Sequence, residues 1–369
     1  MEFQLTAEQV GLQQSVRRLL AARAAPRSAF TEEAPAQARA LWAALNDVGL
    51  GALGLDLPQY ELTSTAIEQM LVAEELGRAV APVPFTGVAA ATSLLSRGTE
   101  PAAAHLLEQV IEGRITVAAL PAATGGGVDV KAAAGDEGWT VDGEVAIVPG
   151  GAWAQTLLVV AHTTNGTPAV LAVELDAPGV TTTPLPAIDP TAGLAQVGFS
   201  RTPAVPVLVH DADEAISAAS ALATLLVAAE STGVAERALR IAAEYALTRR
   251  QFGHPIGAFQ AIKHKLADML VLVENARSAC YGAAWQLSGG EDAGLYVAMA
   301  KAVASESATQ VAADALQIHG GIGCTFEHDI HLYLRRAKSG QLLYGDTAEH
   351  LDVIAAALLD EPIPGGATR

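Results

Sequence analysis

Two adjacent arginines stand at the end of a long helical pattern in the C-terminal half of the chain. The stretch AERALRIAAEYALTRRQFG has apolar residues at helical spacing and ends at Gly253. Arg249 and Phe252 are three residues apart, so the pattern predicts that they share one face of the helix. There, a guanidinium and an aromatic ring could hold one flat or anionic ligand together. A solvated helix end, where the helix dipole favours arginine, explains the same residues without a ligand.

A second stretch, QIHGGIGC, combines a glutamine with closely spaced glycines. Gln317 lies near the end of a helical pattern, and Gly320, Gly321 and Gly323 predict a tight loop after it. Glycines in such a loop let backbone amides approach a phosphate or a ring closely. Glycine also simply ends helices, so the pattern is weak when taken alone. Because no strand pattern precedes it, the stretch does not predict a dinucleotide-binding fold of the Rossmann type.

These two stretches belong to the last of three regions that differ in sequence pattern. Residues 1–113 and 211–360 show helical apolar spacing. Residues 114–210 contain short β-branched runs separated by turn sequences such as DG and TTNG, which predict a small antiparallel barrel or sandwich. Residues 361–369 predict a frayed tail. The expected fold is therefore α-helical with a β middle domain, in the order helices, strands, helices.

Two threonines predict where helices begin in the first region. Thr6 is followed by Gln9 at the position of a capping box, and Val10 is one of the apolar residues expected on the buried face of that helix. Thr65 stands in the same way before a second helical pattern. The chain is 51% hydrophobic and rich in alanine, a composition that favours close-packed helices.

Composition and charge exclude several classes of protein. The formal net charge of −18, without a basic stripe, excludes a general nucleic-acid binder. Two cysteines without metal-ligand spacing argue against a disulfide framework. The chain shows neither a signal-peptide pattern nor a run of about 18 strongly apolar residues, so we expect a cytoplasmic protein without a membrane span. Four histidines lack partnered carboxylate spacing, and we expect packing roles and no metal site for them: His264, His319, His328 and His331.

Taken together, the two stretches resemble the acyl-CoA dehydrogenase family. The resemblance covers nearly the whole chain, including VAEELGRA in the N-terminal region and FEHDIHLYLRRA near the C-terminal end. It implies an N-terminal helical domain, a small β-barrel or sandwich and a C-terminal four-helix bundle. The residues that match the family's motifs are Arg249, Phe252 and Gly253, then Phe259 and Gln260, then Gln317, Gly320, Gly321 and Gly323.

The resemblance implies FAD as the cofactor, bound between subunits. In that family one subunit cradles the flavin ring and supplies a carboxylate base, while the neighbour's Arg-x-x-Phe and Gln-x-x-Gly-Gly segments clasp the pyrophosphate and adenosine end. Arg249, Phe252, Gln317 and the three glycines would then hold the ADP end of a neighbour's FAD. The implied reaction is α,β-desaturation of an acyl-CoA thioester, in which a glutamate removes the α-proton and the β-hydrogen passes as hydride to the flavin.

The catalytic base that the resemblance implies is missing from this sequence. Some family members carry it on the helix before the Arg-x-x-Phe segment, where this chain has Ala223, and Glu230 two turns further on is interpreted as a structural or interfacial carboxylate. Asp346 is the best local substitute, although it is shorter and one position off. Thr347 matches the motif's threonine and is counted with the cofactor-binding residues. The family motif Tyr-Glu-Gly-Thr is replaced here by Tyr344, Gly345, Asp346 and Thr347.

The middle region also departs from the family pattern where it would hold this chain's own flavin. The family's Thr-Glu-Pro and Gly-Ser signature has no clean match in ALPAATGGGVD, residues 119–129. In GEVAIVPGG, Ile147 stands at the place of an aromatic and Pro149 at the place of a hydroxyl. Proline has neither a hydroxyl nor a backbone N–H, so Pro149 can donate nothing to a flavin. LPQYELTS, residues 57–64, is shorter than the family's loop, consistent with a remodelled cleft.

The residues that would serve a neighbour's FAD are thus kept, and those that would serve the chain's own flavin are not. This asymmetry favours the partner subunit of a heteromeric, α2β2-type acyl-CoA dehydrogenase with an acceptor of the electron-transfer flavoprotein type. Related actinobacterial assemblies handle bulky steroid-derived CoA thioesters, and the resemblance extends that expectation to this chain. Two alternatives stay open: a self-sufficient homo-oligomeric dehydrogenase that uses Asp346 or a displaced base, and a non-catalytic FAD- or acyl-CoA-binding protein.

Overall fold

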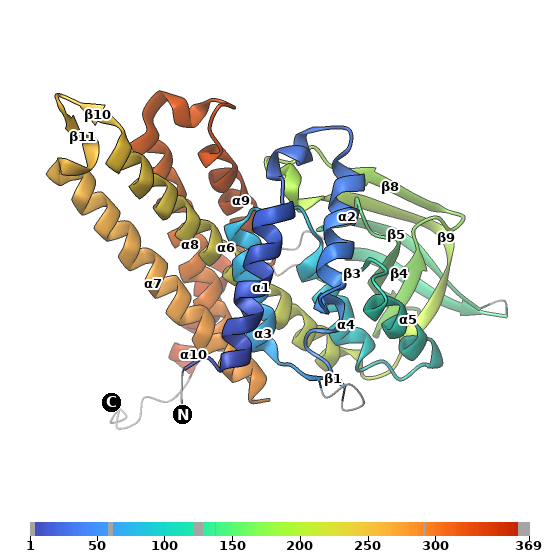
Figure 1. Ribbon diagram of the computed structural model, residues 1–369. Helices are drawn as coiled ribbons and strands as arrows, with labels where there is room; N and C mark the ends of the chain where they lie inside the picture. Colours follow the sequence, from blue (N-terminus) through green and yellow to red (C-terminus); the bar gives the residue numbers. More distant parts are fainter. Residues whose placement is uncertain (1–3, 58–61, 122–127, 137, 291, 361–369) are drawn as a thin grey trace, which may run out of the picture.

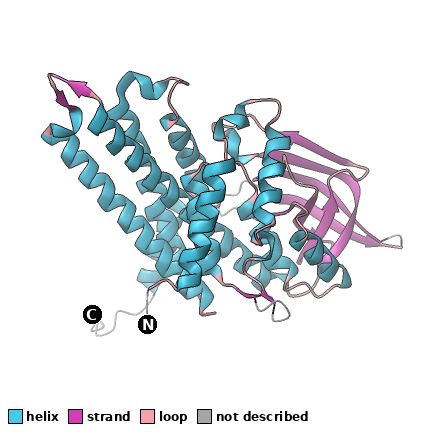
Figure 2. Ribbon diagram, viewed as in Figure 1, coloured by secondary structure: helices cyan, strands magenta, loops and turns pink. Residues whose placement is uncertain are grey.

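The computed structural model describes residues 4–360, apart from four short segments: 58–61, 122–127, 137 and 291. Helices form the N-terminal and C-terminal regions, and a β region lies between them in the sequence (Figure 1, Figure 2). The fold class predicted from the sequence is therefore confirmed. The predicted tail, 361–369, lies outside the described residues, as do parts of the stretches 57–64 and 119–129.

The N-terminal region begins its helices where the two threonines predict. The Thr6 hydroxyl accepts the N–H of Gln9 at 3.2 Å, and the Thr65 hydroxyl accepts the N–H of Ile67 at 3.2 Å. Val10, expected on a buried face, is 37% exposed, because α1 buries only Val16 and Leu20. The elements are α1 (Ala7–Arg23), η1 (Pro26–Phe30), α2 (Ala34–Asn46), η2 (Leu50–Ala52), β1 (Asp56–Leu57), β2 (Leu62–Thr63), α3 (Ala66–Arg78), α4 (Phe85–Leu95) and α5 (Pro101–Ile111).

The middle strands form one seven-stranded sheet that closes on itself. β6, β4, β5, β9 and β7 pair in sequence around a ring, which makes a small barrel with β3 and β8 attached. The expected all-antiparallel pairing is wrong at two places, since β3 and β4 both pair with β6 in parallel. β3 is buried along its whole length, the setting that parallel pairs favour. The strands are β3 (Thr116–Ala119), β4 (Val128–Gly135), β5 (Gly138–Val148), β6 (Thr156–Thr163), β7 (Pro168–Glu174), β8 (Val180–Pro184) and β9 (Ala195–Leu208).

The C-terminal region is a bundle of long helices with an alanine-rich core. Small buried side chains let the helix axes approach closely, and α8 packs against each of the others. Among the described helices, α6 alone is long and apolar enough to cross a bilayer, but 78% of its most apolar window is buried inside the fold. It packs on α7, α8 and α9 of the bundle and on α3 and α4 of the N-terminal region. The helices are α6 (Ala212–Thr248), α7 (Gln260–Ser288), α8 (Gly294–His319), α9 (Ile330–Leu342) and α10 (Thr347–Asp360).

The N-terminal helices lie between the bundle and the barrel (Figure 1). α3 crosses α6 at two glycines. A Cβ on Gly77 would lie 1.9 Å from the carbonyl oxygen of Glu230, and a Cβ on Gly233 would lie 1.9 Å from that of Glu74. The two backbones are therefore in direct contact, which sets the position of Glu230 relative to the N-terminal region.

Candidate functional site

The Arg249 segment is a hairpin rather than a helix face. α6 ends at Thr248, and Arg249 is extended, with φ −68° and ψ 127°. The short strands β10 (Arg250–Gln251) and β11 (His254–Pro255) pair, with Phe252 at φ +50° in the turn between them. The prediction that Arg249 and Phe252 share a helical face is wrong, because the turn at Gly253, with φ +81°, overrides the helical spacing. Phe252 is 89% exposed and meets Phe259 edge-on.

The glycine segment forms the tight loop that the sequence predicts. After α8 the chain makes a single turn, η6 (Gly320–Cys324), and Gly320 takes φ +63°. A Cβ on Gly320 or Gly321 would meet nothing within 4 Å, so the backbone there borders open space. Gly323 is buried instead, and its Cβ position lies 3.0 Å from the carbonyl oxygen of Leu316. Gln317, one turn earlier, is exposed.

Ring stacking holds the ends of α6 and α8 side by side. Tyr245 stacks on His319 with ring centroids 4.4 Å apart and planes 24° apart, and His328 packs against the same pair. The His319 Nδ1–H donates to the carbonyl oxygen of Ala315 at 2.7 Å, and burial lowers the pKa of His319. The hairpin 249–255 and the loop 317–324, together called the tip below, thus lie at one end of the bundle (Figure 1).

The tip presents a guanidinium that nothing nearby neutralises. Within the described residues, the exposed Arg249 side chain makes no ion pair and no hydrogen bond. Its neighbour Arg250 is different, since its guanidinium donates to the carbonyl oxygen of Gly253 at 3.4 Å. Arg249, Phe252 and Gln317 therefore offer a cation, a ring and an amide to a ligand that would bind from outside.

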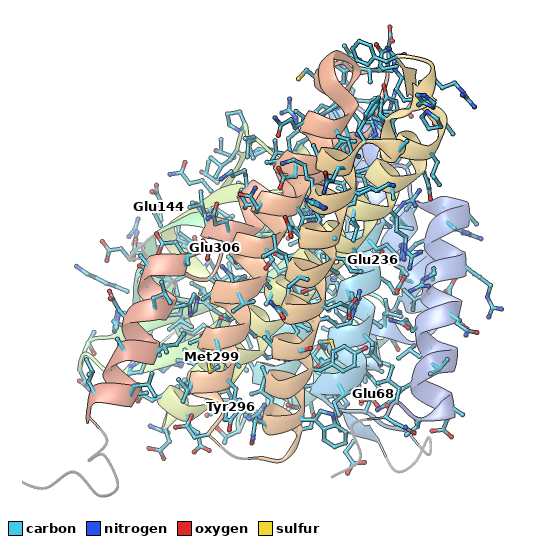
Figure 3. The ribbon with its side chains drawn as sticks, turned by 90° about the vertical axis from the view of Figure 1, so that its left-hand side faces the viewer. Glu68, Glu144, Glu236, Tyr296, Met299 and Glu306 are labelled. Carbon is cyan, nitrogen blue, oxygen red and sulfur yellow. The ribbon has the colours of Figure 1, made fainter. Side chains whose placement is uncertain are left out.

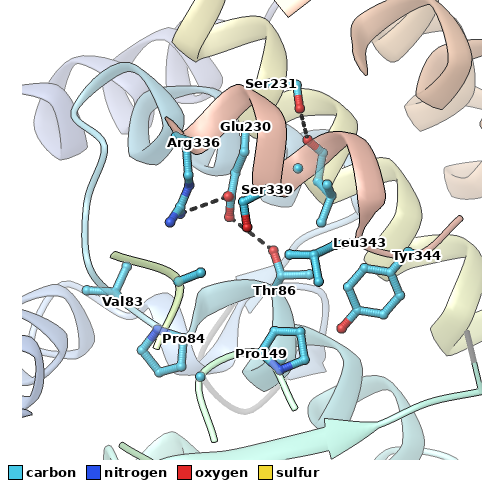
Figure 4. A pocket seen from close by; sticks show the side chains of 15 residues that line it. Val83, Pro84, Thr86, Pro149, Glu230, Ser231, Arg336, Ser339, Leu343 and Tyr344 are labelled. Atoms are coloured by element: carbon cyan, nitrogen blue, oxygen red, sulfur yellow. Dashed lines mark hydrogen bonds and ion pairs between the residues drawn. The ribbon is translucent and has the colours of Figure 1, made fainter. Parts of the chain in front are cut away.

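A second site lies in the interior, where the three regions of the chain meet. A cavity of about 40 Å³, called the inner cavity below, is lined by Thr86 on α4, Pro149 after β5, Glu230 on α6, Arg336 on α9 and Tyr344 after α9 (Figure 4). The structure thus brings together two of the segments in which the sequence departs from the family pattern, those that contain Pro149 and Tyr344. Pockets that bind small molecules usually measure about 300–1,000 Å³, so this cavity is far smaller.

Buried ionic groups take up the space around the inner cavity. The Arg336 guanidinium donates to Glu230 at 2.9 Å and to Thr191 at 3.1 Å, and lies 3.3 Å from the Asp189 carboxylate. The Thr86 hydroxyl donates to the other oxygen of Glu230 at 3.1 Å. Burial alone would lower the pKa of Arg336, but the carboxylates of Glu230 and Asp189 outweigh it, so this pKa is raised. Glu230 is therefore a structural carboxylate, as the sequence suggested.

The sequence did not single out the residues that form this network with Glu230. Thr86, Asp189 and Arg336 come from three regions, and Arg336 lies 147 residues from Asp189 and 106 from Glu230. Arg336 sits within the motif stretch FEHDIHLYLRRA, and its place on the buried side of α9 is the only sequence signal that marks it. A charged residue on a buried helix face predicts a buried partner but does not name it.

Gly345 and Asp346 form a tight turn at the position of the family's base. The Asp346 carboxylate does not face the inner cavity. Asp346 accepts the N–H of Glu349 at 3.0 Å and so caps α10, and it does not line the inner cavity. The fully buried Lys301 donates to the carbonyl oxygen of Gly345 at 2.6 Å, and His350 donates to that of Tyr344 at 2.9 Å. Gly345 takes φ +94°, and a Cβ there would lie 2.6 Å from His350 Nε2. This geometry disfavours Asp346 as a base.

The remaining residues named from the sequence are scattered around these sites. Thr347 begins α10, and its buried hydroxyl has no hydrogen-bond partner among the described residues. Ile147 is exposed on β5, away from the inner cavity, and Ala223 is fully buried in α6. Tyr344 also lines the inner cavity, and its buried hydroxyl likewise meets no hydrogen-bond partner in the part of the chain that the structure describes. Burial, and after it the nearby Glu230 carboxylate, raises the pKa of Tyr344. Of His264, His319, His328 and His331, none joins a group of three metal-ligating side chains in the described part of the chain.

Comparison with known proteins assigns the chain to a family. The profile of the acyl-CoA dehydrogenase N-terminal domain matches residues 6–114, and that of the C-terminal domain matches residues 215–359. The acyl-CoA dehydrogenase IpdE2 of Mycobacterium tuberculosis is 31% identical over 320 residues, which cover 85% of each chain. The chain belongs to the acyl-CoA dehydrogenase family. Proteins of this family are oxidoreductases that bind FAD.

Two similar solved structures are complexes of two different chains. One is the ChsE4-ChsE5 complex from Mycobacterium tuberculosis, with a TM-score of 0.86, 29% identity and coverage of 98% of this chain and 100% of that chain. The other is a variant of the steroid ACAD Tcur3481-Tcur3483, with a TM-score of 0.85, 28% identity and coverage of 96% and 98%.

The two sites differ in how they fit FAD. The inner cavity, at about 40 Å³ and bordered by buried ions, does not fit a flavin ring. Pro149 at its wall offers no N–H donor. The tip offers an unpaired guanidinium, an exposed glutamine and an open glycine backbone, which fit the charge and shape of a nucleotide pyrophosphate.

Proposed function

We propose that this chain is the partner subunit of a heteromeric, FAD-dependent acyl-CoA dehydrogenase. Its tip holds the ADP half of an FAD whose flavin ring lies in a related catalytic chain, which also supplies the base. Arg249 faces the pyrophosphate, Gln317, Gly320 and Gly321 line the nucleotide, and Phe252 packs on it. Gly323, which is buried behind them, shapes the loop. Thr347 begins α10 beside the Gly345 turn and is not part of the tip. When bound, the flavin supplies the hydride acceptor for α,β-desaturation of the thioester.

One observation carries the proposal: the tip is exposed, whereas the inner cavity is only about 40 Å³ and its wall contains the ion pair between Arg336 and Glu230. A self-sufficient dehydrogenase needs both halves of a flavin site and a base that reaches substrate. Gly345 supplies no base, and the Asp346 carboxylate is engaged at the start of α10. A chain that keeps only the outward-facing half of the site requires a second chain for turnover.

The similar complexes extend the proposal to the assembly and its substrate. ChsE4-ChsE5 and Tcur3481-Tcur3483 each pair two chains, and the latter is described as a steroid ACAD. We therefore assign this chain to a cytoplasmic α2β2 assembly that acts on a bulky, steroid-derived acyl-CoA. Its electrons pass to an acceptor of the electron-transfer flavoprotein type.

The test compares the chain alone with the chain co-expressed beside an adjacent dehydrogenase gene. Alone, it is expected to be colourless and inactive; in the complex, flavin absorbance should give one FAD for each pair of chains. A chain that is yellow alone and reduces an electron acceptor with acyl-CoA would be a self-sufficient homo-oligomer. A flavin-containing complex that never turns over any acyl-CoA would instead be a binding protein.

A further inference from the structure

The last residue of α8, His319, lies where the two segments of the tip meet. Figure 3 shows α8 rising from Tyr296 through Met299 and Glu306 toward the end of the bundle that carries the tip. His319 ends this helix and directly precedes η6 (Gly320–Cys324), the turn that contains the glycines of the tip. Contacts that fix the His319 ring therefore also fix the point at which the glycine loop begins.

The His319 ring connects the glycine loop to the Arg249 hairpin. It stacks on Tyr245 of α6 with ring centroids 4.4 Å apart, and Tyr245 stands four residues before Arg249. The ring also packs on His328, with centroids 4.3 Å apart. The Cβ of His319 lies 3.1 Å from the position that a Cβ on Gly323 would take, so the loop packs closely on this side chain. One side chain thus contacts both segments of the tip, and a shift of its ring would change the distance between them.

The hydrogen bonds of His319 define a neutral ring. Its Nδ1 lies 2.7 Å from the carbonyl oxygen of Ala315, which can only accept, so Nδ1 carries the proton. The other ring nitrogen, Nε2, is buried and has no hydrogen-bond partner among the described residues, and His319 as a whole is 4% exposed. A second proton on Nε2 would place a donor and a positive charge in the interior without an acceptor. The neutral ring fits this position, and the imidazolium does not.

The groups around the His319 ring do not favour a second proton. α6 presents the ring of Tyr245, the segment after η6 presents His328, and α8 itself presents the carbonyl oxygen of Ala315. Burial lowers the pKa of His319, and His328 acts in the same direction, while the Ala315 carbonyl oxygen opposes them. Within the described part of the chain, no carboxylate contributes to this pKa. A ring that takes up a second proton is therefore more stable outside the stack, where water can solvate it.

We infer that His319 is a positioning residue for the nucleotide half of the flavin site and that it holds the tip together only as a neutral ring, an inference that rests on the proposed function. His319 acts through Arg249 and Gln317, which stand on the two segments that its ring joins. In an opened tip the ring has the usual pKa of about 6.5, and in the closed tip it has a lower one. The closed tip is therefore fully favoured above pH 6.5 and becomes less favoured as the pH falls below that value.

The test measures FAD binding by the complex with the co-expressed partner at about pH 7.5 and about pH 5.5. Flavin fluorescence follows the release of FAD, at protein concentrations where sedimentation velocity shows the assembled complex at both pH values. One proton on a ring with a pKa of about 6.5 weakens binding by up to about ten-fold between these conditions. The ratio of the two dissociation constants is therefore expected to be about five to ten for the parent complex.

Three variants separate the proton from the ring. His319→Phe keeps an aromatic ring but cannot take a proton, so its ratio should fall below about two. His105→Phe is the matched control, because His105 is an exposed histidine of the N-terminal region, and it should keep the ratio of the parent. His319→Ala removes the ring and should weaken FAD binding at both pH values at least about ten-fold. Thermal melts of each variant check folding.

The outcomes separate this inference from the proposed function. If His319→Phe keeps the ratio of the parent, or the parent shows no pH dependence, the inference is wrong. It is also wrong if His319→Ala binds FAD as tightly as the parent. In each of these cases the proposed function stands as long as Arg249→Ala lowers the flavin content of the complex. If neither Arg249→Ala nor His319→Ala changes the flavin content, the tip lies outside the cofactor site, and the inference and the proposed function fail together.

Discussion

The tip and the inner cavity differ in whether their arginine side chains are paired. At the tip, the Arg249 guanidinium stands in solvent with no partner among the described residues. At the inner cavity, Arg336 is 7% exposed and is surrounded by acceptors from all three regions. An unpaired charged side chain in solvent costs the fold little free energy, whereas a charged side chain in the interior is destabilising unless it is paired. The difference shows that a charge in the interior ties together residues from all three regions, whereas an exposed binding group makes no demand on the packing around it.

Arg336→Ala is expected to give the largest effect, because it leaves Glu230 and Asp189 buried without their cation. Breaking a buried pair from one side typically costs about 3–5 kcal/mol, measurable as the free energy of unfolding in urea. Arg335→Ala is the matched control, since Arg335 makes an exposed bond to the carbonyl oxygen of Ile188. If Arg336→Ala is no more destabilising than its neighbour, the inner cavity is not held by this network.

Arg249→Ala tests the other side of the comparison. Removal of a charge-assisted contact to pyrophosphate should weaken FAD binding in the complex by about 1.5–3 kcal/mol, with the stability of the chain unchanged within about 0.5 kcal/mol. Arg250→Ala serves as control, because its guanidinium already bonds within the hairpin. Flavin content after gel filtration is the measurement. Full flavin occupancy in Arg249→Ala would remove the tip from the cofactor site.

Gly345→Glu restores a carboxylate at the family's base position and should still give no activity in the chain alone. The backbone takes φ +94° and the new Cβ would meet His350 Nε2 at 2.6 Å, so destabilisation of about 1–3 kcal/mol is expected. Thermal melts and an acyl-CoA-dependent dye assay measure the two effects. Turnover by this variant would mean that the inner cavity is an intact catalytic site that lacks only its base.

The smallest expected effect concerns the lysine behind the same turn. Burial lowers the pKa of Lys301 to about 8, while Asp346 and Glu349 oppose the shift. Between this value and the usual 10.5, the unfolded chain binds the proton and the folded chain does not. The free energy of unfolding should therefore rise with pH, by at most about 1.4 kcal/mol per pH unit, and by about 1.6 kcal/mol over pH 8 to 9.5. Lys301→Met should lack this rise; identical pH profiles would place the lysine in solvent.

Local sequence signals predicted the local parts of the fold. The two threonine caps are confirmed, because a capping box is formed by residues three apart. The order of helical and strand regions is also confirmed, since periodicity is a short-range property. The Arg249 hairpin was missed because helical spacing continues up to Thr248 and the glycine turn after it was read only as a helix end.

Long-range pairings could not be predicted in the same way. Nothing local to β3 or β4 states that both run parallel to β6. The members of the network around Arg336 are likewise joined only by the packing of three regions. The family motifs allowed the inference that the inner site was lost, since Gly345 and Pro149 are missing chemical groups. They gave no indication of the ion pair between Arg336 and Glu230, because a buried ion pair depends on distances that a motif does not contain.

The two glycines where α3 meets α6 limit where an assembly containing this chain can enlarge its interior. Main chain lies within 1.9 Å of a methyl group added at either Gly77 or Gly233. A change of side-chain rotamer cannot relieve such a collision, because the atoms that collide belong to the main chain. The distance between α3 and α6 is therefore fixed at this crossing. Any widening of the space between the N-terminal region and the bundle must therefore come from positions other than this crossing.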